Sequence, residues 1–276
     1  MVEIEKVQEI IREASKLFLD RNAASQAREK GMCDFVTAVD EAVQAFIQHK
    51  LYARYPDIQF IGEEKDNTAI DMAGTVWVLD PVDGTTNLIH DYHASAISLA
   101  LMENREAVMG VIYDPYLDEM YHAEKGKGSF MNGSPIHVSR VQAMRESLIA
   151  IGTAPYFKEV ADENFALFAK IFRDCQDIRR CGAASLDLAH VACGRIDGYL
   201  ESHLKIWDYA AGALIVREAG GAVLNYQGDE LPMAMSGSVV VGNPKIAGVL
   251  VEDYLNVQTG YNGGHSQLSQ CVPNFR

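Results

Sequence analysis

The chain has 276 residues, of which 48% are hydrophobic and 22% charged, and a formal net charge of −14. A chain of this length can bury a substantial core, as one large domain or as two packed halves. Its acidity argues against nucleic acid as the main ligand, because contacts to a phosphate backbone need basic stripes. A membrane partner is not expected, since no apolar run approaches the roughly 18 residues of a membrane span. The charged start, Met1–Lys6, lacks the apolar region of a signal peptide, so a cytoplasmic location is expected.

The cysteines give no sign of a disulfide framework or a zinc site. They are odd in number, scattered along the chain and without a Cys-x-x-Cys pair. Reduced thiols are therefore expected at Cys33, Cys175, Cys181, Cys193 and Cys271.

Two amphipathic helices are predicted at the start of the chain. Apolar residues recur at spacings of three and four over residues 4–18, which is typical of one helical face. Thr37 and Asp40 then precede a second apolar pattern over residues 42–51, with Thr37 as the expected cap. Pro56 ends that helix.

The middle of the chain predicts strands. Residues 60–61 and 76–79 are short apolar runs that stop at acidic residues, as strands do when they end at a site. Four further strand-like runs follow, separated by turn-forming residues: 96–102, 108–113, 119–122 and 129–130. This pattern predicts an antiparallel meander.

The rest of the chain alternates strand-like and helix-like segments. Strands are expected at 148–151, 196–201 and 239–241, and helices at 164–172, 185–193 and 208–219. Such alternation predicts an α/β half. The division that follows is an α+β half over residues 1–139, an α/β half over 140–259, and a mobile tail over 260–276.

The segment from Trp77 to Asn87 is the most informative. An apolar strand leads into Asp80, Pro81 fixes a turn, and Asp83 precedes Gly84 at the expected start of a helix. Two carboxylates at a strand end offer oxygen ligands to a hard cation such as Mg²⁺, and main-chain N–H groups at a helix start can hold phosphate oxygens. A bound cation would also let an acidic protein accept a phosphate. A simple tight turn is the favoured explanation of Asp80 and Asp83 when they are taken alone.

Further acids occur in similar settings. Glu63 and Glu64 end a second strand-like run, Asp208 opens a helix, and Asp40 lies in the first turn of the second helix. Each has an alternative structural explanation, as a solvated turn residue or as a helix cap. Their number strengthens the hypothesis of a metal site.

Four segments, in the same order along the chain, resemble the signatures of the inositol monophosphatase family. They are Asp34–Asp40, Gly62-Glu63-Glu64, Asp80–Asn87 and Trp207–Gly212. The resemblance implies a layered α/β (α+β) phosphatase fold in which helix and sheet layers alternate in two tightly packed halves. It also implies Mg²⁺-dependent, lithium-sensitive hydrolysis of a small phosphomonoester, usually by a homodimer.

The family's site residues can be carried over onto matching positions. The resemblance implies that two or three Mg²⁺ ions are held by Glu63, Asp80, the main-chain carbonyl of Val82, Asp83 and Asp208. Water would be oriented by Glu63 and activated by Thr85 together with Asp40. Main-chain N–H groups of Gly84 and Thr85 would contact phosphate.

The residues expected around the rest of the substrate are Asp83, Ala183, Glu201 and Asp208. Glu201 matches a family position that often contacts substrate hydroxyls, although a strand-end charge explains it equally well. The family commonly has a threonine where this chain has Ala183. Lys30 is about one residue out of step with a family lysine, so no role is assigned to it.

Inositol monophosphate or a related sugar or polyol phosphate is the first expectation for the substrate. Fructose 1,6-bisphosphate, NADP, histidinol phosphate and 3′-phosphonucleotides stay open, because specificity depends on pocket walls outside the motifs. An aspartyl-phosphate phosphatase is the rival enzyme class, but its acids are two residues apart, whereas Asp80 and Asp83 are three apart. A regulatory, protein-binding role is the alternative outside catalysis.

Overall fold

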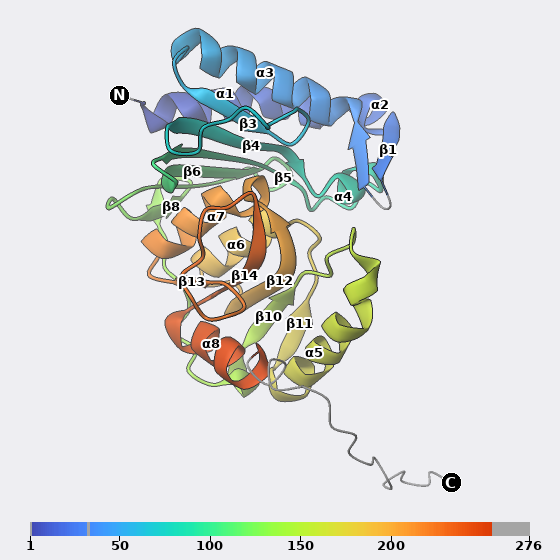
Figure 1. Cartoon of the computed structure of the whole chain (residues 1–276), viewed down its shortest axis with the longest axis vertical. Helices are drawn as coiled ribbons and strands as arrows, with labels where there is room; N and C mark the ends of the chain where they lie inside the picture. The colour runs from blue at the N-terminus through green and yellow to red at the C-terminus, as the bar shows by residue number, and fades with distance from the viewer. Residues whose placement is uncertain (1, 32–33, 256–276) are drawn as a thin grey trace, which may run out of the picture.

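Helix layers and sheet layers alternate through the molecule in a computed structural model that describes residues 2–31 and 34–255 (Figure 1). The helices are α1 (Ile4–Phe18), α2 (Arg21–Ala24), α3 (Ala38–Arg54), α4 (Thr85–Ile89), α5 (Ala161–Asp174), α6 (Ala184–Ala192), α7 (Ile206–Glu218) and α8 (Pro244–Val249), with short helical turns at Met144–Glu146, Lys158–Val160 and Leu250–Leu255. The strands are β1 (Ala27–Gly31), β2 (Asp34–Thr37), β3 (Gln59–Gly62), β4 (Thr75–Asp83), β5 (Ala96–Glu103), β6 (Glu106–Asp114), β7 (Glu119–Glu124), β8 (Ser129–Met131), β9 (Ser134–Pro135), β10 (Leu148–Ile151), β11 (Asp177–Arg179), β12 (Gly198–Lys205), β13 (Ala222–Leu224) and β14 (Ser236–Gly242). The predicted layered α/β architecture is confirmed.

The outer layer consists of α1 and α3, and both predicted helices are present. The apolar stripe of α1 is buried, from Val7 to Phe18. A capping box starts α3: the Thr37 side chain accepts a hydrogen bond from the Val39 N–H (3.1 Å), and Asp40 accepts one from the Thr37 N–H (2.9 Å). The capping box was expected from the sequence, and it fixes Asp40 in the first turn of α3.

The first sheet has seven strands in the order β3-β4-β5-β6-β7-β8-β9. From β4 onward each strand pairs antiparallel with the next, which confirms the meander, while β3 runs parallel to β4. Successive side chains of β4 point to opposite faces: Trp77 and Leu79 pack against α1 and α3, and Val76 and Val78 pack against α7. The alternation puts Asp80 on the α7 side.

One local expectation at β4 was wrong. The sequence predicted that the strand stops at Asp80 and turns at Pro81, but β4 continues to Asp83. The pairing with β5 shifts register between Asp80 and Asp83, so Pro81 lies at a β-bulge. Proline is tolerated there because a bulged residue need not donate to the ladder. The bulge brings Asp80 and Asp83 to one edge of the sheet.

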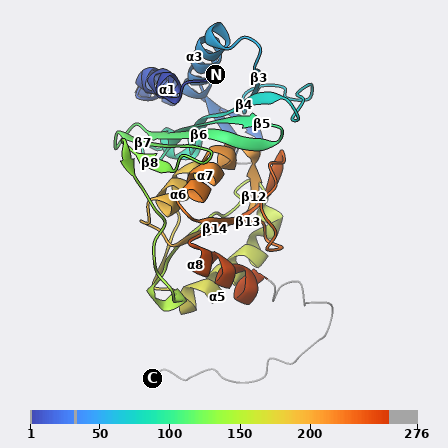
Figure 2. The same cartoon turned by 90° about the vertical axis from the view of Figure 1, so that its left-hand side faces the viewer.

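The central layer consists of α6 and α7, which lie between the two sheets (Figure 2). Small residues let these elements approach closely. A Cβ placed on Gly110 of β6 would lie 2.7 Å from the Ala211 carbonyl oxygen, and one on Gly212 would lie 2.6 Å from the Leu188 Cβ. Both distances are too short for any side chain, so glycine sets the spacing between α7, the first sheet and α6.

The second sheet has five strands in the order β11-β10-β12-β14-β13. Its inner strand β10 runs parallel to β11 and β12, while β14 runs antiparallel to β12 and β13. Helices α5 and α8 cover its outer face (Figure 1). The predicted alternation of strands and helices is confirmed here, whereas the division of the chain between residues 139 and 140 stays a prediction.

Several short elements had no clear sequence signal, among them the β1–β2 hairpin, β11, β13 and α8. Of the cysteines, Cys175, Cys181 and Cys193 carry free thiols. Cys33, Cys271, the side chain of Lys30 and the predicted tail over residues 260–276 lie outside the described part of the chain. Within the described residues, every helix is too short or too polar to cross a membrane.

Candidate active site

A cavity of about 870 Å³ lies where the ends of β4 and α4 face α6, β12 and α7. It is lined by nine of the residues that the sequence singled out: Glu63, Asp80, Val82, Asp83, Gly84, Thr85, Ala183, Glu201 and Asp208. Segments more than 100 residues apart in the sequence therefore meet in one place. Asp40 is not among the lining residues.

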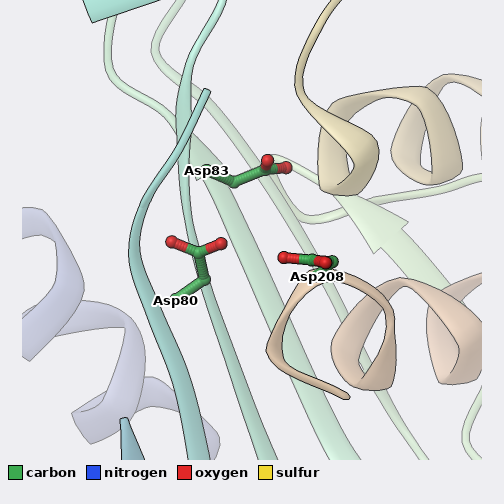
Figure 3. A group of neighbouring side chains, drawn as sticks. All are labelled: Asp80, Asp83 and Asp208. Atoms are coloured by element: carbon green, nitrogen blue, oxygen red, sulfur yellow. The ribbon is translucent and has the colours of Figure 1, made fainter. Parts of the chain in front are cut away.

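Three carboxylates form the centre of the site (Figure 3). Asp80 and Asp83 come from β4 and Asp208 comes from the first turn of α7, and their nearest oxygen atoms all lie within 4.8 Å of one another. Local hydrogen bonds hold two of them. The Val82 N–H donates to Asp80 Oδ1 (3.0 Å), and the Lys205 N–H donates to Asp208 Oδ2 (2.7 Å).

Asp83 is held by a residue that sequence reasoning missed. Its Oδ2 atom accepts a hydrogen bond from the Ser185 N–H (2.6 Å) and a second from the Ser185 hydroxyl. Ser185 is buried at the start of α6, 102 positions along the chain. Nothing in the sequence around Ser185 distinguishes it from an ordinary helical residue, so only the fold reveals the contact.

The electrostatics of the three carboxylates suit a bound cation. Burial raises the pKa of Asp80 well above its ordinary value, and the neighbouring charges of Glu63, Asp83 and Asp208 raise it further. Burial likewise raises the pKa of Asp208, with Asp83 and Glu63 adding to the effect. Within the described residues, no ion pair neutralises Asp80, Asp83 or Asp208. Ionised acids so close together need positive charge from outside the chain.

The donor chemistry identifies the kind of cation. Carboxylate and carbonyl oxygens are the ligands of Mg²⁺, Ca²⁺ and Mn²⁺, whereas zinc sites use mainly histidine and cysteine. Glu63 is half-buried beside the three carboxylates, and Val82 also lines the cavity. The residues present therefore fit a hard divalent metal.

A second hydrogen-bonded unit lies beside the carboxylates. The Thr85 hydroxyl lies 2.9 Å from Asp40 Oδ1 and 3.0 Å from the Val82 carbonyl oxygen. Asp40 is fully buried, and its other oxygen is occupied by Thr37. Burial raises the pKa of Asp40, and hydrogen bonds from Thr37 and Thr85 oppose that rise. Asp40 does not line the cavity itself, but it accepts a hydrogen bond from Thr85, which does.

Gly84 precedes α4 in a conformation that few other residues adopt. Its φ is +90°, in the left-handed region, and an added Cβ would lie 2.9 Å from the Ala94 carbonyl oxygen. The Ser95 hydroxyl donates to the Gly84 carbonyl (2.8 Å) and fixes the turn. The backbone is therefore bare where it faces the cavity, and an anion can approach it closely.

Glu201 lies on the opposite wall, on β12. Its Oε1 accepts a hydrogen bond from the Ala154 N–H (2.7 Å), and its Oε2 accepts one from the Tyr199 hydroxyl (2.6 Å). A Cβ on Gly152 would overlap this carboxylate, so glycine makes room for it. Ala183 adds a small buried methyl group to the wall.

An oxygen-only carboxylate site, next to a glycine turn and a helix start and enclosed between two sheets, defines the class of metal-dependent phosphatases. A family model described as "Inositol monophosphatase family" matches residues 2–259. The chain belongs to the inositol monophosphatase family, and it is a phosphomonoesterase.

Individual relatives agree with this. The chain is 39% identical to the Nus factor SuhB of Escherichia coli strain K12, over 81% of this chain and 83% of that protein. It is 34% identical to the inositol-1-monophosphatase of Bacillus subtilis, over 82% and 85% of the two chains. A solved structure of SaIMPase-II, a staphylococcal inositol monophosphatase with inositol monophosphate bound, superposes with a TM-score of 0.79 and 29% identity, over 93% of this chain and 94% of that one.

Proposed function

We propose that the protein hydrolyses a small phosphomonoester in a Mg²⁺-dependent reaction, with inositol monophosphate or a related sugar or polyol phosphate as the substrate. The observation that carries the proposal is the group formed by buried Asp80 and Asp83 and half-buried Asp208 on the cavity wall. The similarity to the B. subtilis inositol-1-monophosphatase, and the SaIMPase-II structure with inositol monophosphate, support this choice of substrate.

The same carboxylates, with Glu63 and the Val82 carbonyl, would hold two or three Mg²⁺ ions. When bound, the ions supply positive charge that makes water more acidic and stabilises the charge that develops on the phosphate and the leaving oxygen. Asp83 and Asp208 keep their orientation without metal, because Ser185 and the Lys205 N–H already bind one oxygen of each. The remaining oxygens are free to act as ligands.

Thr85 and Asp40 would position the attacking water. A threonine hydroxyl has one hydrogen to donate and two lone pairs that accept. Since Asp40 Oδ1 or the Val82 carbonyl takes that hydrogen, the lone pairs of Thr85 can accept a hydrogen bond from water in the cavity. Asp40 is a positioning residue in this scheme, and half-buried Glu63 is the acid that would receive the proton of water.

The remaining contacts would orient the substrate. Main-chain N–H groups of Gly84 and Thr85, at the start of α4, would bind phosphate oxygens. On the far wall Glu201 would accept hydrogen bonds from substrate hydroxyls, and the methyl group of Ala183 would contribute an apolar contact. The family's threonine contact is missing at that position.

Phosphate release tests the proposal directly. The panel consists of inositol monophosphate, fructose 1,6-bisphosphate, NADP, histidinol phosphate and a 3′-phosphonucleotide, each with Mg²⁺, with EDTA, and with Mg²⁺ plus Li⁺. We expect Mg²⁺-dependent release that Li⁺ inhibits, and the fastest release from a polyol or sugar phosphate. Fastest release from NADP or a 3′-phosphonucleotide would replace the proposed substrate class. Release that persists in EDTA would contradict the metal mechanism.

A regulatory, protein-binding role is the second candidate, favoured by the 39% identity to the Nus factor SuhB of E. coli. Loss of the metal ligands does not affect such a role directly. A cell that lacks the protein, complemented with either the wild type or the Asp208→Asn variant, distinguishes the catalytic role from the binding role. Rescue of the phenotype by the inactive variant indicates a binding role. A homodimeric state and a cytoplasmic location are further expectations, which light scattering and cell fractionation test.

A further inference from the structure

The residues that line the cavity include two with buried polar atoms that have no hydrogen-bond partner among the described residues. They are Asp187 Oδ1 and the hydroxyl oxygen of Tyr226. Both residues line the cavity. Buried polar atoms are nearly always paired, so two unpaired ones in one cavity indicate a missing ligand.

Asp187 is the more deeply placed of the two. It lies in the first turn of α6, and only 2% of its surface is exposed. Burial raises the pKa of its carboxyl, and the nearby charges of Glu201 and Asp83 raise it further, while Arg180 lowers it. A buried carboxyl oxygen that receives no hydrogen bond is costly, so its position on the cavity wall calls for a donor from a bound molecule.

Tyr226 lies in the turn after β13 and also lines the cavity. Its N–H donates to the Ser238 hydroxyl (3.1 Å), which holds the turn in place. Burial raises the pKa of the Tyr226 hydroxyl, and the charge of Glu201 raises it further. The hydroxyl therefore keeps its proton and can donate as well as accept.

Glu201 acts on both residues but is itself already paired. Each of its oxygens accepts one hydrogen bond from the chain, from the Ala154 N–H and from the Tyr199 hydroxyl. The wall therefore presents an unpaired acceptor at Asp187, a donor at Tyr226 and a partly used acceptor at Glu201. This mixture matches a ligand with several hydroxyl groups, each of which both donates and accepts.

We propose that Asp187 and Tyr226 form a hydroxyl-binding subsite, which makes the enzyme selective for polyhydroxylated phosphomonoesters over esters of plain alcohols. Asp187 accepts a hydrogen bond from one substrate hydroxyl and Tyr226 bonds another, while the phosphate lies at the metal-binding carboxylates. The inference rests on the proposed phosphatase function and names the part of the substrate that this wall recognises.

A pair of substrates of similar shape tests the subsite. Inositol 1-phosphate has ring hydroxyls and cyclohexyl phosphate has none. We expect Tyr226→Phe to lower kcat/KM for inositol 1-phosphate about three- to tenfold, the range for one neutral hydrogen bond, and Asp187→Ala to lower it about ten- to hundredfold. Neither variant should change kcat/KM for cyclohexyl phosphate. Tyr254→Phe is the matched control, because its hydroxyl bonds Asp174 on the surface of the second half.

The outcomes distinguish a failure of the proposed function from a failure of the hydroxyl-binding subsite. If the wild type releases phosphate from neither ester, the proposed function fails and this inference fails with it. If the wild type hydrolyses both esters equally well, or if a variant slows both to the same extent, the phosphatase stands and the subsite is overturned. Asp187→Asn, which preserves the shape of the side chain, provides the same comparison if Asp187→Ala does not fold.

Discussion

Acids at two places on the same side of the first sheet, Glu119 alone and Asp80, Asp83 and Asp208 together, have opposite electrostatic surroundings. Glu119 on β7 forms a two-point ion pair with Arg195, at 2.6 Å for each oxygen, and also accepts from the Tyr121 hydroxyl (2.6 Å). Arg195 lowers the pKa of Glu119 through these hydrogen bonds. At the other group, burial and like charges raise the pKa values of Asp80 and Asp208.

The difference separates an acid that is paired within the chain from the acids that we propose as metal ligands. Glu119 carries its counter-charge within the chain, so its ion pair ties the end of α6 to the first sheet. The three aspartates have no such partner among the described residues, and they hold mutual repulsion that an external cation relieves. Variants of the two groups should therefore change stability in opposite directions.

The largest effect is expected from Asp208→Asn. Turnover with Mg²⁺ should fall by at least about a hundredfold, since loss of even a residue that supports a metal ligand costs about 10–100-fold. The fold should survive in EDTA without loss of stability, because the raised pKa means that ionised Asp208 opposes folding at neutral pH. Phosphate release and thermal melts with EDTA or Mg²⁺ measure both.

Asp114→Asn is the control for this variant. Asp114 is another buried acid with a raised pKa, but it bonds the Tyr116 and Leu117 N–H groups outside the cavity. The Asp114→Asn variant should keep the turnover of the wild type and should still be stabilised by Mg²⁺. Normal turnover of Asp208→Asn at limiting Mg²⁺ would contradict the metal assignment.

Asp40→Asn should show the next largest effect. Asp40 holds Thr85 from behind the cavity wall, so its loss should lower kcat about ten- to hundredfold, less than the loss of a group that itself takes the proton. KM should change less than kcat, because Asp40 is not among the residues that line the cavity. Steady-state kinetics at saturating Mg²⁺ separates the two constants, and a pure KM effect would rule out the role in water activation.

Ser185→Ala should raise the Mg²⁺ concentration needed for half-maximal phosphate release about tenfold, as is typical for loss of a hydrogen bond to a metal ligand. The Ser185 N–H still holds Asp83, so the effect is smaller than that of losing a ligand. Mg²⁺ titrations of phosphate release measure it. Ser147→Ala is the matched control, since this buried hydroxyl donates to the Met144 carbonyl (2.7 Å) outside the site. Equal Mg²⁺ responses of the two variants would remove Ser185 from the site.

Arg195→Met should have the smallest effect. It should lower the free energy of unfolding, whereas Asp208→Asn in EDTA should not lower it. We expect a loss of about 1–2 kcal/mol of unfolding free energy, because 42% of the Arg195 side chain is exposed and solvent screens the pair. Turnover should stay normal. Urea unfolding measures the loss, and a stabilised variant would break the contrast between the two groups of acids.

The pH dependence of this variant follows from the lowered pKa of Glu119. An acid whose pKa falls on folding contributes stability that is complete above its unfolded pKa, here 4.5, and is lost as pH falls through the folded value. The difference between Arg195→Met and the wild type should therefore be constant near neutral pH and shrink below about pH 4.5. A difference that grows on acidification would exclude the ion pair as its source.

The sequence predicted those parts of the site that lie in short contiguous motifs. Asp80, Asp83 and Gly84 adjoin one strand end; a short apolar run predicted that strand, and the alternation of strand-like and helix-like segments predicted the helix that carries Asp208. Ser185, Asp187 and Tyr226 were not predicted. They lie in ordinary helical or turn sequences, and their roles depend on how α6 and the turn after β13 come together at the cavity, which no local pattern encodes. The bulge at Pro81 was missed because proline signals a turn and a bulged strand equally.

Glycine at two positions also determines how sensitive this enzyme is to inherited change. Gly110 lets α7 lie directly on the first sheet, and Gly212 lets α6 lie directly on α7. The gap between Asp208 on α7 and the acids of β4 therefore depends on the absence of a methyl group at Gly110, which is not among the residues that line the cavity. In a screen of random alleles, Gly110→Ala would lose activity to the same extent as substitutions in the active site, although it replaces no residue of that site. Such alleles would show that the distance between α7 and the first sheet is itself under selection.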